Sequence, residues 1–201
     1  MKLYLSPGAC SLASHITLQE LGLSHDIEKV DLRQHRTISG QDFYSINPKG
    51  YVPALQLDDG AVLTEGPAIL QYLADLKPEA RLAPANGTIA RYRLQEWLAY
   101  LNSEIHKTFG VFFTPDSTEA EKAAAGNRLA RKFEWLQAQL GTRTSLMPDG
   151  FTVADAYLYT LLGWTGFVGI DLGRWPGLKA YHAHTGARPA VQAAHKAEQA
   201  A

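Results

Sequence analysis

The sequence predicts an α/β domain followed by an all-helical domain, and two observations carry this prediction. Short apolar strands alternate with helices as far as residue 78, whereas from residue 88 the apolar residues recur only at helical spacing. Between them lie Pro84 and the pair Asn86-Gly87, which are typical of a loop. We therefore expect domains at residues 1–78 and 88–201, joined by a linker at 79–87.

The composition indicates a globular protein with a small-molecule ligand. The chain has 201 residues, of which 46% are hydrophobic, so it can fill a core. Its formal net charge of −1 gives no reason to expect nucleic acid or a membrane as partner, and no apolar run is long enough to span a bilayer. The single cysteine excludes an internal disulfide and argues against a cysteine-based metal site. We expect a cytoplasmic protein without a metal.

The sequence of the first domain predicts alternating strands and helices. We expect strands at 2–5 and 26–31, a helix from Cys10 to about Leu23 and a loop with a short helix at 33–42. A hairpin at 54–63 that turns at Asp58-Asp59-Gly60 and a helix that begins at Pro67 and ends near Lys77-Pro78 follow. This order is typical of a thioredoxin-like domain. Apolar residues occur on both sides of the first helix, so we expect it to be covered on both sides, with His15 as a structural residue.

Two positions in this domain are candidates for chemistry. Cys10 falls at a helix N-terminus, where free N–H groups can lower the pKa of a thiol and make it nucleophilic; the alternative is an inert buried cysteine. Glu65 and Gly66 lie where a strand ends and a helix begins, which suits an anionic group of a ligand; the alternative is a simple helix cap. Pro53 stands at a strand entrance, where an ordinary trans proline is the default.

The second domain is predicted to be helical throughout. Thr88 caps a helix whose core stripe is Leu94, Leu98, Leu101, Ile105 and Phe109. Small and polar residues form a neighbouring arc, which is either a cleft wall or a plain solvent face: Ala99, Asn102, Ser103, His106 and Gly110.

Two capping boxes begin later helices. Thr118 pairs with Glu121 in a helix that Gly141 ends, and Thr152 pairs with Asp155 in front of an apolar run that we expect to end before Trp164. Replacing Asp155 by alanine is expected to cost on the order of 1–2 kcal/mol. Helices at Trp175–Gly186 and from Arg188 onward complete the domain.

Several of these segments together resemble the glutathione transferases, and the bacterial beta class in particular. The resemblance rests on Cys10, on Tyr51-Val52-Pro53-Ala54-Leu55, on Leu63-Thr64-Glu65-Gly66 and on Ser103-Glu104-Ile105-His106-Lys107. It spans nearly the whole chain. It implies a thioredoxin-like domain that binds glutathione, a helical domain that forms the electrophile site, a cis Pro53, a homodimer and a role in detoxification.

The resemblance also implies roles for single residues. Val52 offers its backbone N–H and C=O to the cysteinyl residue of glutathione, beside Pro53, and Glu65 with Gly66 holds the γ-glutamyl group. Cys10 lies at the sulfur with Ser11 close by, and His106 assists as a polar or proton-transferring group. The remaining glutathione-binding candidates are His35, Asn102 and Ser103.

Two positions depart from the family pattern. His35 stands where a lysine often binds the glycine carboxylate of glutathione, and Ala99 stands where an asparagine is common. Weaker binding is expected unless Lys49 or Arg36 replaces the missing cation and Asn102 replaces the missing amide.

The implied activity is that of a glutathione transferase. It covers conjugation of glutathione to small hydrophobic electrophiles and glutathione-dependent thiol exchange or peroxide reduction through Cys10. The alternative is a non-catalytic protein of the same fold that binds glutathione or a hydrophobic ligand and acts as a regulator.

Overall fold

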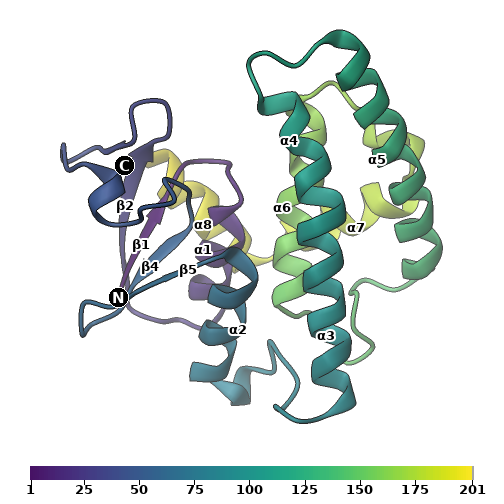
Figure 1. Ribbon diagram of the computed structural model, residues 1–201. Coiled ribbons are helices and arrows are strands. Elements are labelled where there is room, and N and C mark those ends of the chain that lie inside the picture. The colour runs from purple at the N-terminus through teal and green to yellow at the C-terminus, as the bar shows by residue number, and fades with distance from the viewer. Residues whose placement is uncertain (201) are drawn as a thin grey trace. The chain divides into compact units, whose positions relative to one another are not determined.

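The structure is a computed structural model that describes residues 1–200 (Figure 1). Its contacts divide the chain into two units. The first unit is Met1–Ala83 together with the C-terminal segment from Arg188 onward, and the second is Pro84–Ala187. The expected helical domain extended through the C-terminus, whereas the contacts group that last segment with the α/β unit.

The first unit is built on a mixed sheet with the strand order β3-β2-β1-β4-β5. The strands are β1 (Lys2–Leu5), β2 (Asp26–Asp31), β3 (Arg36–Thr37), β4 (Ala54–Gln56) and β5 (Val62–Thr64). β1 runs parallel to β2, with Leu3 opposite Ile27, and antiparallel to β4, with Leu3 opposite Leu55. β4 and β5 form the predicted hairpin.

The helices of this unit lie along one side of the strands in Figure 1. They are α1 (Ser11–Glu20), α2 (Gly66–Leu76) and α8 (Pro189–Ala200). The unit also has two short 3₁₀ turns, η1 (Phe43–Ser45), which lies on the other side of the sheet, and η2 (Pro78–Ala80). α1 contacts β1, α2 and α8, and its residues 11–18 are all buried. The predicted covering of α1 on two sides is confirmed, and α8 is the second cover.

Polar contacts connect α8 to α1 and thus to the first unit. Arg188 donates from Nε and Nη2 to the two carboxylate oxygens of Glu20 at 2.6 and 3.0 Å. Near the other end of α8, the Glu198 carboxylate lies 3.1 Å from Nδ1 of the buried His15. The last helix is therefore attached to α1 near both of its ends, which a pattern of alanines and charges does not predict.

The face of the sheet opposite the helices has its own small core. Because side chains alternate along a strand, Tyr4 points away from Leu3 and Leu5. It packs in a buried cluster with Phe43 of η1 and with Val30, Val52 and Ala54. Val52 is thus fixed by its side chain, and the Val52–Pro53 peptide bond is cis, as the resemblance implied. Phe43 fills this core from a 3₁₀ turn that starts after residues 33–42, and a two-residue strand stands inside the stretch predicted to be a loop with a short helix.

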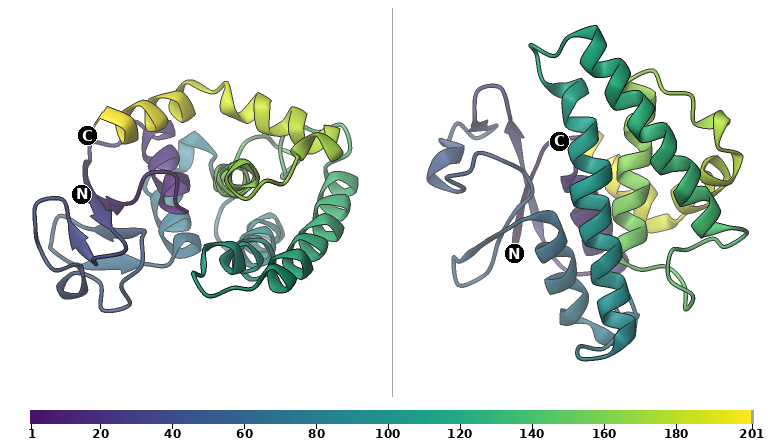
Figure 2. Two further views of the ribbon diagram at one scale, coloured as in Figure 1. Left: turned by 90° about the horizontal axis from the view of Figure 1, so that it is seen from above. Right: turned by 45° about the vertical axis from the view of Figure 1, so that its right-hand side comes forward.

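The second unit consists of helices that enclose α6. They are α3 (Ile89–Tyr100), η3 (Leu101–His106), α4 (Lys107–Phe113), α5 (Glu119–Leu140), α6 (Val153–Phe167), η4 (Leu172–Arg174) and α7 (Pro176–Gly186). Figure 2 shows α6 end-on among the others, and residues 153–162 are all buried. Trp164 lies buried inside α6, which continues to Phe167, so the expectation that it follows the helix was wrong.

The segment η3 is a π-helical insertion between α3 and α4. The predicted stripe of Leu94, Leu98, Leu101, Ile105 and Phe109 is buried and confirmed. The wider turn was not predicted, because nothing local in the sequence marks it. Such insertions occur often at functional sites, and this one carries Asn102, Ser103 and His106.

Both predicted capping boxes are present. Thr118 and Glu121 form an exposed box at the start of α5. The second box is buried: the two Asp155 oxygens accept hydrogen bonds from the Thr152 N–H and hydroxyl, and also from the Leu146 N–H and the Tyr181 hydroxyl, at 2.7–2.9 Å. Burial raises the pKa of Asp155, and these four donors oppose the rise.

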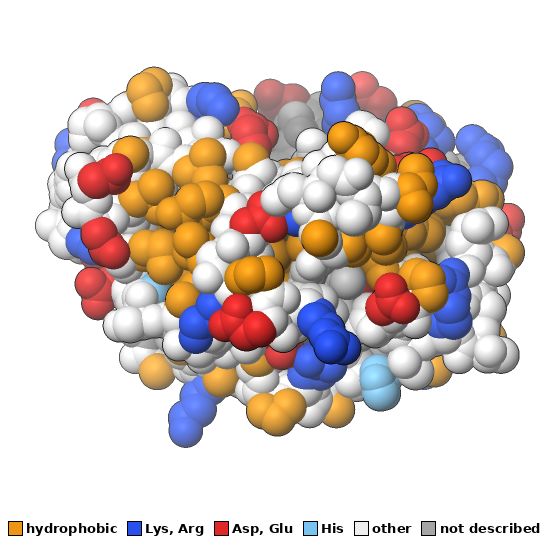
Figure 3. Space-filling view, turned by 90° about the horizontal axis from the view of Figure 1, so that it is seen from below, with side chains coloured by type: hydrophobic (Ala, Val, Ile, Leu, Met, Phe, Trp, Pro, Cys, Tyr) orange, Lys and Arg blue, Asp and Glu red, His pale blue; other side chains and the backbone are white. Residues whose placement is uncertain are grey.

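Charged side chains do not concentrate on one part of the face drawn in Figure 3. Acidic and basic groups are interspersed there, with hydrophobic side chains gathered between them, in keeping with a net charge of −1. No helix within residues 1–200 is long and apolar enough to cross a membrane.

Replacing Asp155 by alanine should lower the free energy of unfolding by about 2–4 kcal/mol. The sequence alone predicts less, because the Leu146 and Tyr181 donors that also lose their acceptor are not visible in the motif. Urea unfolding followed by circular dichroism measures the change. Glu121→Ala, which opens the exposed box, is the matched control and should have a much smaller effect. Equal losses in the two variants would contradict this assignment.

Candidate active site

Ser11, Val52 and Glu65, which are predicted site residues, lie near the sulfur of Cys10. This residue follows the loop Ser6–Ala9 and caps the N-terminus of α1. Its thiol donates a hydrogen bond to the carbonyl oxygen of Val52 at 3.2 Å. The backbone N–H groups of Cys10 and Ser11 also face the sulfur, and the Glu65 carboxylate is near enough to affect the pKa of the thiol. Cys10, Ser11, Val52 and Glu65 therefore belong to one site.

The expectation of a lowered pKa at Cys10 was wrong. Although Cys10 keeps an intermediate exposure, protein surrounds the sulfur closely, and this burial raises the pKa of the thiol to about 12. The two N–H groups act in the opposite direction, and Glu65 adds to the rise. Loss of hydration thus outweighs the helix N-terminus. In the protein without ligand, Cys10 is a neutral hydrogen-bond donor at neutral pH.

Ser11 acts on the loop through its side chain. Its buried hydroxyl accepts from the Ser6 N–H at 3.2 Å and lies 3.3 Å from the Ser6 carbonyl oxygen, to which it donates. The hydroxyl therefore closes the turn between β1 and α1. The part of Ser11 that faces the Cys10 sulfur is the backbone N–H.

The backbone around Val52 is held in place from both sides. Asn47 is buried and donates to the Tyr51 carbonyl oxygen at 2.7 Å, while Val52 is buried in the cluster with Tyr4 and Phe43. No hydrogen bond of the Val52 N–H is found within residues 1–200, and the Val52 carbonyl is used only by Cys10 there. Sequence reasoning missed Asn47, although an asparagine before Pro48-Lys49-Gly50 is a turn signal.

Glu65 does not serve as a cap for α2. Its side chain makes no capping hydrogen bond, and its backbone has φ 70°, a conformation that costs a residue other than glycine free energy. The carboxylate instead accepts from Lys49 Nζ at 2.7 Å, and Lys49 also donates to Thr64. Gly66 follows as the first residue of the helix. These contacts favour the interpretation of Glu65 as a ligand-binding group over its interpretation as a simple helix cap.

His35 has an unusual environment. It has φ 51°, its ring lies 4.5 Å from that of Tyr44, and its buried Nδ1 has no hydrogen-bond partner among the described residues. The two cations considered as substitutes are engaged elsewhere: Lys49 with Glu65, and Arg36 with the Gly40 carbonyl oxygen. His35 as a ligand for the glycine carboxylate stays a prediction.

The predicted polar residues of the second unit meet at Tyr157. Nδ1 of His106 lies 2.6 Å from the Tyr157 hydroxyl, which donates to Asn102 at 3.0 Å. Burial lowers the pKa of His106, so the imidazole is neutral at pH 7, and its ring packs edge-on against Trp164. Ser103 is exposed on the same π-helical segment. Sequence reasoning missed Tyr157; a tyrosine in the most buried helix, whose hydroxyl needs a partner, was the available signal.

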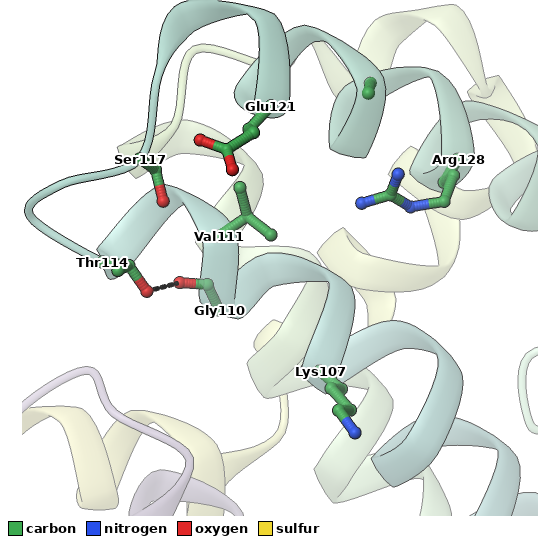
Figure 4. Close-up of a pocket in the computed structure, with 8 residues that line it drawn as sticks. Lys107, Gly110, Val111, Thr114, Ser117, Glu121 and Arg128 are labelled. Atoms are coloured by element: carbon green, nitrogen blue, oxygen red, sulfur yellow. Dashed lines mark hydrogen bonds between the residues drawn. The ribbon is translucent and has the colours of Figure 1, made fainter.

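A separate groove lies between α4 and α5 in the second unit. Its volume is about 500 Å³, and Lys107, Val111, Glu121 and Arg128 line it with other residues of these helices (Figure 4). Gly110, from the arc predicted to be either a cleft wall or a solvent face, is part of its wall, whereas none of the predicted catalytic or glutathione-binding residues is. Within residues 1–200 there is no group of three His, Cys, Asp or Glu residues that could hold a metal ion.

The comparisons with known proteins identify the family of the chain. Residues 8–76 match the family model of the glutathione S-transferase N-terminal domain, and residues 119–184 match that of the C-terminal domain. The chain belongs to the glutathione S-transferase family.

Individual family members are similar over almost the whole chain. The glutathione S-transferase GstA of Escherichia coli O157:H7 is 44% identical over 98% of both chains. A sphingomonad glutathione S-transferase solved with glutathione is 49% identical, covers 100% of both chains and has a TM-score of 0.97. The beta-class enzyme of Sphingomonas chungbukensis is also 49% identical, over 98% of both chains, with a TM-score of 0.96. The resemblance to the bacterial beta class is confirmed.

The rate at which iodoacetamide alkylates Cys10 should rise with pH without a plateau up to about pH 10, because the thiol has a pKa of about 12. The protein has one cysteine, so intact-mass analysis reports this sulfur alone. The alkylation rate of free glutathione, measured in parallel, should level off at a pH of about 9. A plateau in the protein below pH 8 would contradict the assignment of a neutral thiol.

Proposed function

We propose that this protein is a glutathione transferase that conjugates glutathione to small electrophiles, with Cys10 acting as a hydrogen-bond donor in the site. The observation that supports this proposal is the bond from the Cys10 thiol to the Val52 carbonyl. The family membership supports the same activity.

Glutathione is proposed to bind along Val52 as an added strand does. The Val52 N–H and carbonyl would pair with the cysteinyl carbonyl and N–H of the peptide. The carbonyl already accepts from a thiol in the ligand-free protein, so the ligand exchanges one donor for another. The cysteinyl sulfur then comes near Cys10 and the N–H groups of Cys10 and Ser11, which can stabilise a thiolate on glutathione.

The γ-glutamyl group is assigned to Glu65 and Gly66. Its ammonium replaces Lys49 at the Glu65 carboxylate, and its carboxylate meets the N-terminus of α2 beside Gly66. Lys49 and Glu65 are both exposed, so their ion pair is weak and its exchange is cheap.

In the reaction, the sulfur of glutathione loses its proton and its electron pair forms the bond to carbon of the electrophile. A leaving group departs with the bonding pair, or the anion formed by addition takes up a proton. A neutral imidazole is able to accept a proton, and we assign His106 to this role together with Asn102 and Ser103 as neighbouring polar groups.

The raised pKa of Cys10 disfavours thiol exchange through this residue. With a pKa of about 12, the thiolate fraction at pH 7 is on the order of 10⁻⁵. A mixed disulfide therefore forms slowly in the ligand-free protein. A homodimer in the cytoplasm that acts in detoxification remains part of the proposal on the strength of the family alone.

Cys10→Ala is expected to keep at least about a tenth of the conjugating activity, because the N–H groups of the α1 terminus remain to stabilise the glutathione thiolate. The readout is kcat/KM with 1-chloro-2,4-dinitrobenzene. Cys10→Ser, which keeps a donor of similar size, is the matched control and should lie closer to the wild type. A much larger loss in the alanine variant, together with rapid formation of a glutathione adduct on wild-type Cys10, would mean that redox chemistry dominates. Glutathione binding without any turnover would favour the non-catalytic alternative.

Glu65→Gln should weaken glutathione binding about tenfold in calorimetry, because the ammonium then meets a neutral amide oxygen in place of a charged carboxylate. Lys49→Gln is the informative comparison, because it removes the lysine that pairs with Glu65. Glutathione binding to this variant should be unchanged or tighter. The dipeptide Cys-Gly, which lacks the γ-glutamyl group, should bind to wild type and to Glu65→Gln with similar affinity. Equal weakening by both substitutions would place the γ-glutamyl group elsewhere.

A further inference from the structure

Glu198 connects the C-terminal helix to the loop that precedes Cys10. Its Oε2 accepts a hydrogen bond from the Gly8 N–H at 3.1 Å, and its Oε1 lies 3.1 Å from Nδ1 of His15. Glu198 and His15 are buried, with 3% and 0% of their surfaces exposed. A buried carboxylate is stable only with partners, so both contacts constrain the position of its two oxygens.

The loop that Glu198 contacts leads directly into Cys10. Gly8 has φ 74° and stands two residues before Cys10, inside the turn in which the Ala9 N–H donates to the Ser6 carbonyl. The Leu12 N–H donates to the Ala9 carbonyl. The loop and the first turn of α1 thus form one hydrogen-bonded unit, and the Gly8–Glu198 bond connects the loop to α8.

We propose that Glu198 is a positioning residue for the thiol site: it holds the Ser6–Ala9 loop closed over Cys10 and so keeps the thiol buried and aimed at the Val52 carbonyl. The catalytic consequence rests on the function proposed above. The effect on the thiol does not, since it concerns the protein without ligand.

Two similar contacts on the same helix allow a matched comparison. The Arg188–Glu20 pair also attaches α8 to α1, but Glu20 lies at the far end of α1 from the loop. Breaking it loosens α8 without touching Gly8. A role of Glu198 limited to stability therefore predicts the same behaviour for both sites, whereas a positioning role predicts a change at Cys10 for Glu198 alone.

The test is the pH profile of Cys10 alkylation by iodoacetamide in wild type, Glu198→Ala, Glu198→Gln and Glu20→Ala. Opening the loop hydrates the sulfur, so Glu198→Ala should react about tenfold faster near pH 8, with its profile moved to lower pH. Glu65 is the charged group that faces the sulfur, and it is unchanged in all variants. Glu198→Gln keeps an acceptor for the Gly8 N–H and should resemble wild type. Glu20→Ala removes both acceptors of Arg188 and should also resemble wild type.

Urea unfolding of each variant separates stability from reactivity. If Glu198→Ala does not fold, Glu198→Asp takes its place, because the shorter side chain cannot reach Gly8 and His15 together and should also react faster than wild type. Unchanged reactivity in a folded Glu198→Ala or Glu198→Asp variant would overturn the proposal, and so would an equal acceleration in Glu20→Ala. Failure of wild type to bind glutathione would instead count against the proposed function and leave this result standing.

Discussion

The hydrogen bond from the Cys10 thiol to the Val52 carbonyl joins the two segments on which the site depends. Val52 is fixed because its side chain packs under the sheet and Asn47 holds the preceding carbonyl, so the acceptor cannot move away. The thiol is fixed because the loop before it is closed by Ser11 and by Glu198. Neither segment alone would place a donor and an acceptor 3.2 Å apart.

This arrangement explains how a cysteine at a helix N-terminus can remain neutral. The N–H groups of α1 stabilise negative charge on the sulfur, yet removing the sulfur from water costs more. The balance suits a site in which the charge forms on the ligand. In the proposed complex, glutathione brings its own thiol to the same N–H groups, and the protein thiol remains a donor beside it.

Local signals predicted much of this fold. The capping boxes at Thr118 and Thr152, the strand order along the chain and the stripe on α3 are properties of neighbouring residues, and they were confirmed. The residues around the sulfur were named from the family resemblance, and the structure brings Cys10, Ser11, Val52 and Glu65 together.

What sequence reasoning missed depends on contacts between distant segments. The pKa of Cys10 follows from burial, which a motif does not report. Gly8 and Glu198 are separated by 190 positions, and Tyr157 is separated by 51 from His106. The π-helical turn and the place of α8 in the first unit have the same origin, since packing with remote residues decides both.

The infrared S–H stretching band tests the central claim most directly, because the protein has a single thiol. At about pH 9 an ordinary cysteine is mostly ionised and has little of this band. We predict that Cys10 shows it in full, at the lowered frequency of a hydrogen-bond donor, and that S-methylglutathione, which carries no thiol, shifts it by taking over the Val52 carbonyl. Absence of the band at this pH, or a band that bound S-methylglutathione leaves unchanged, would contradict the account.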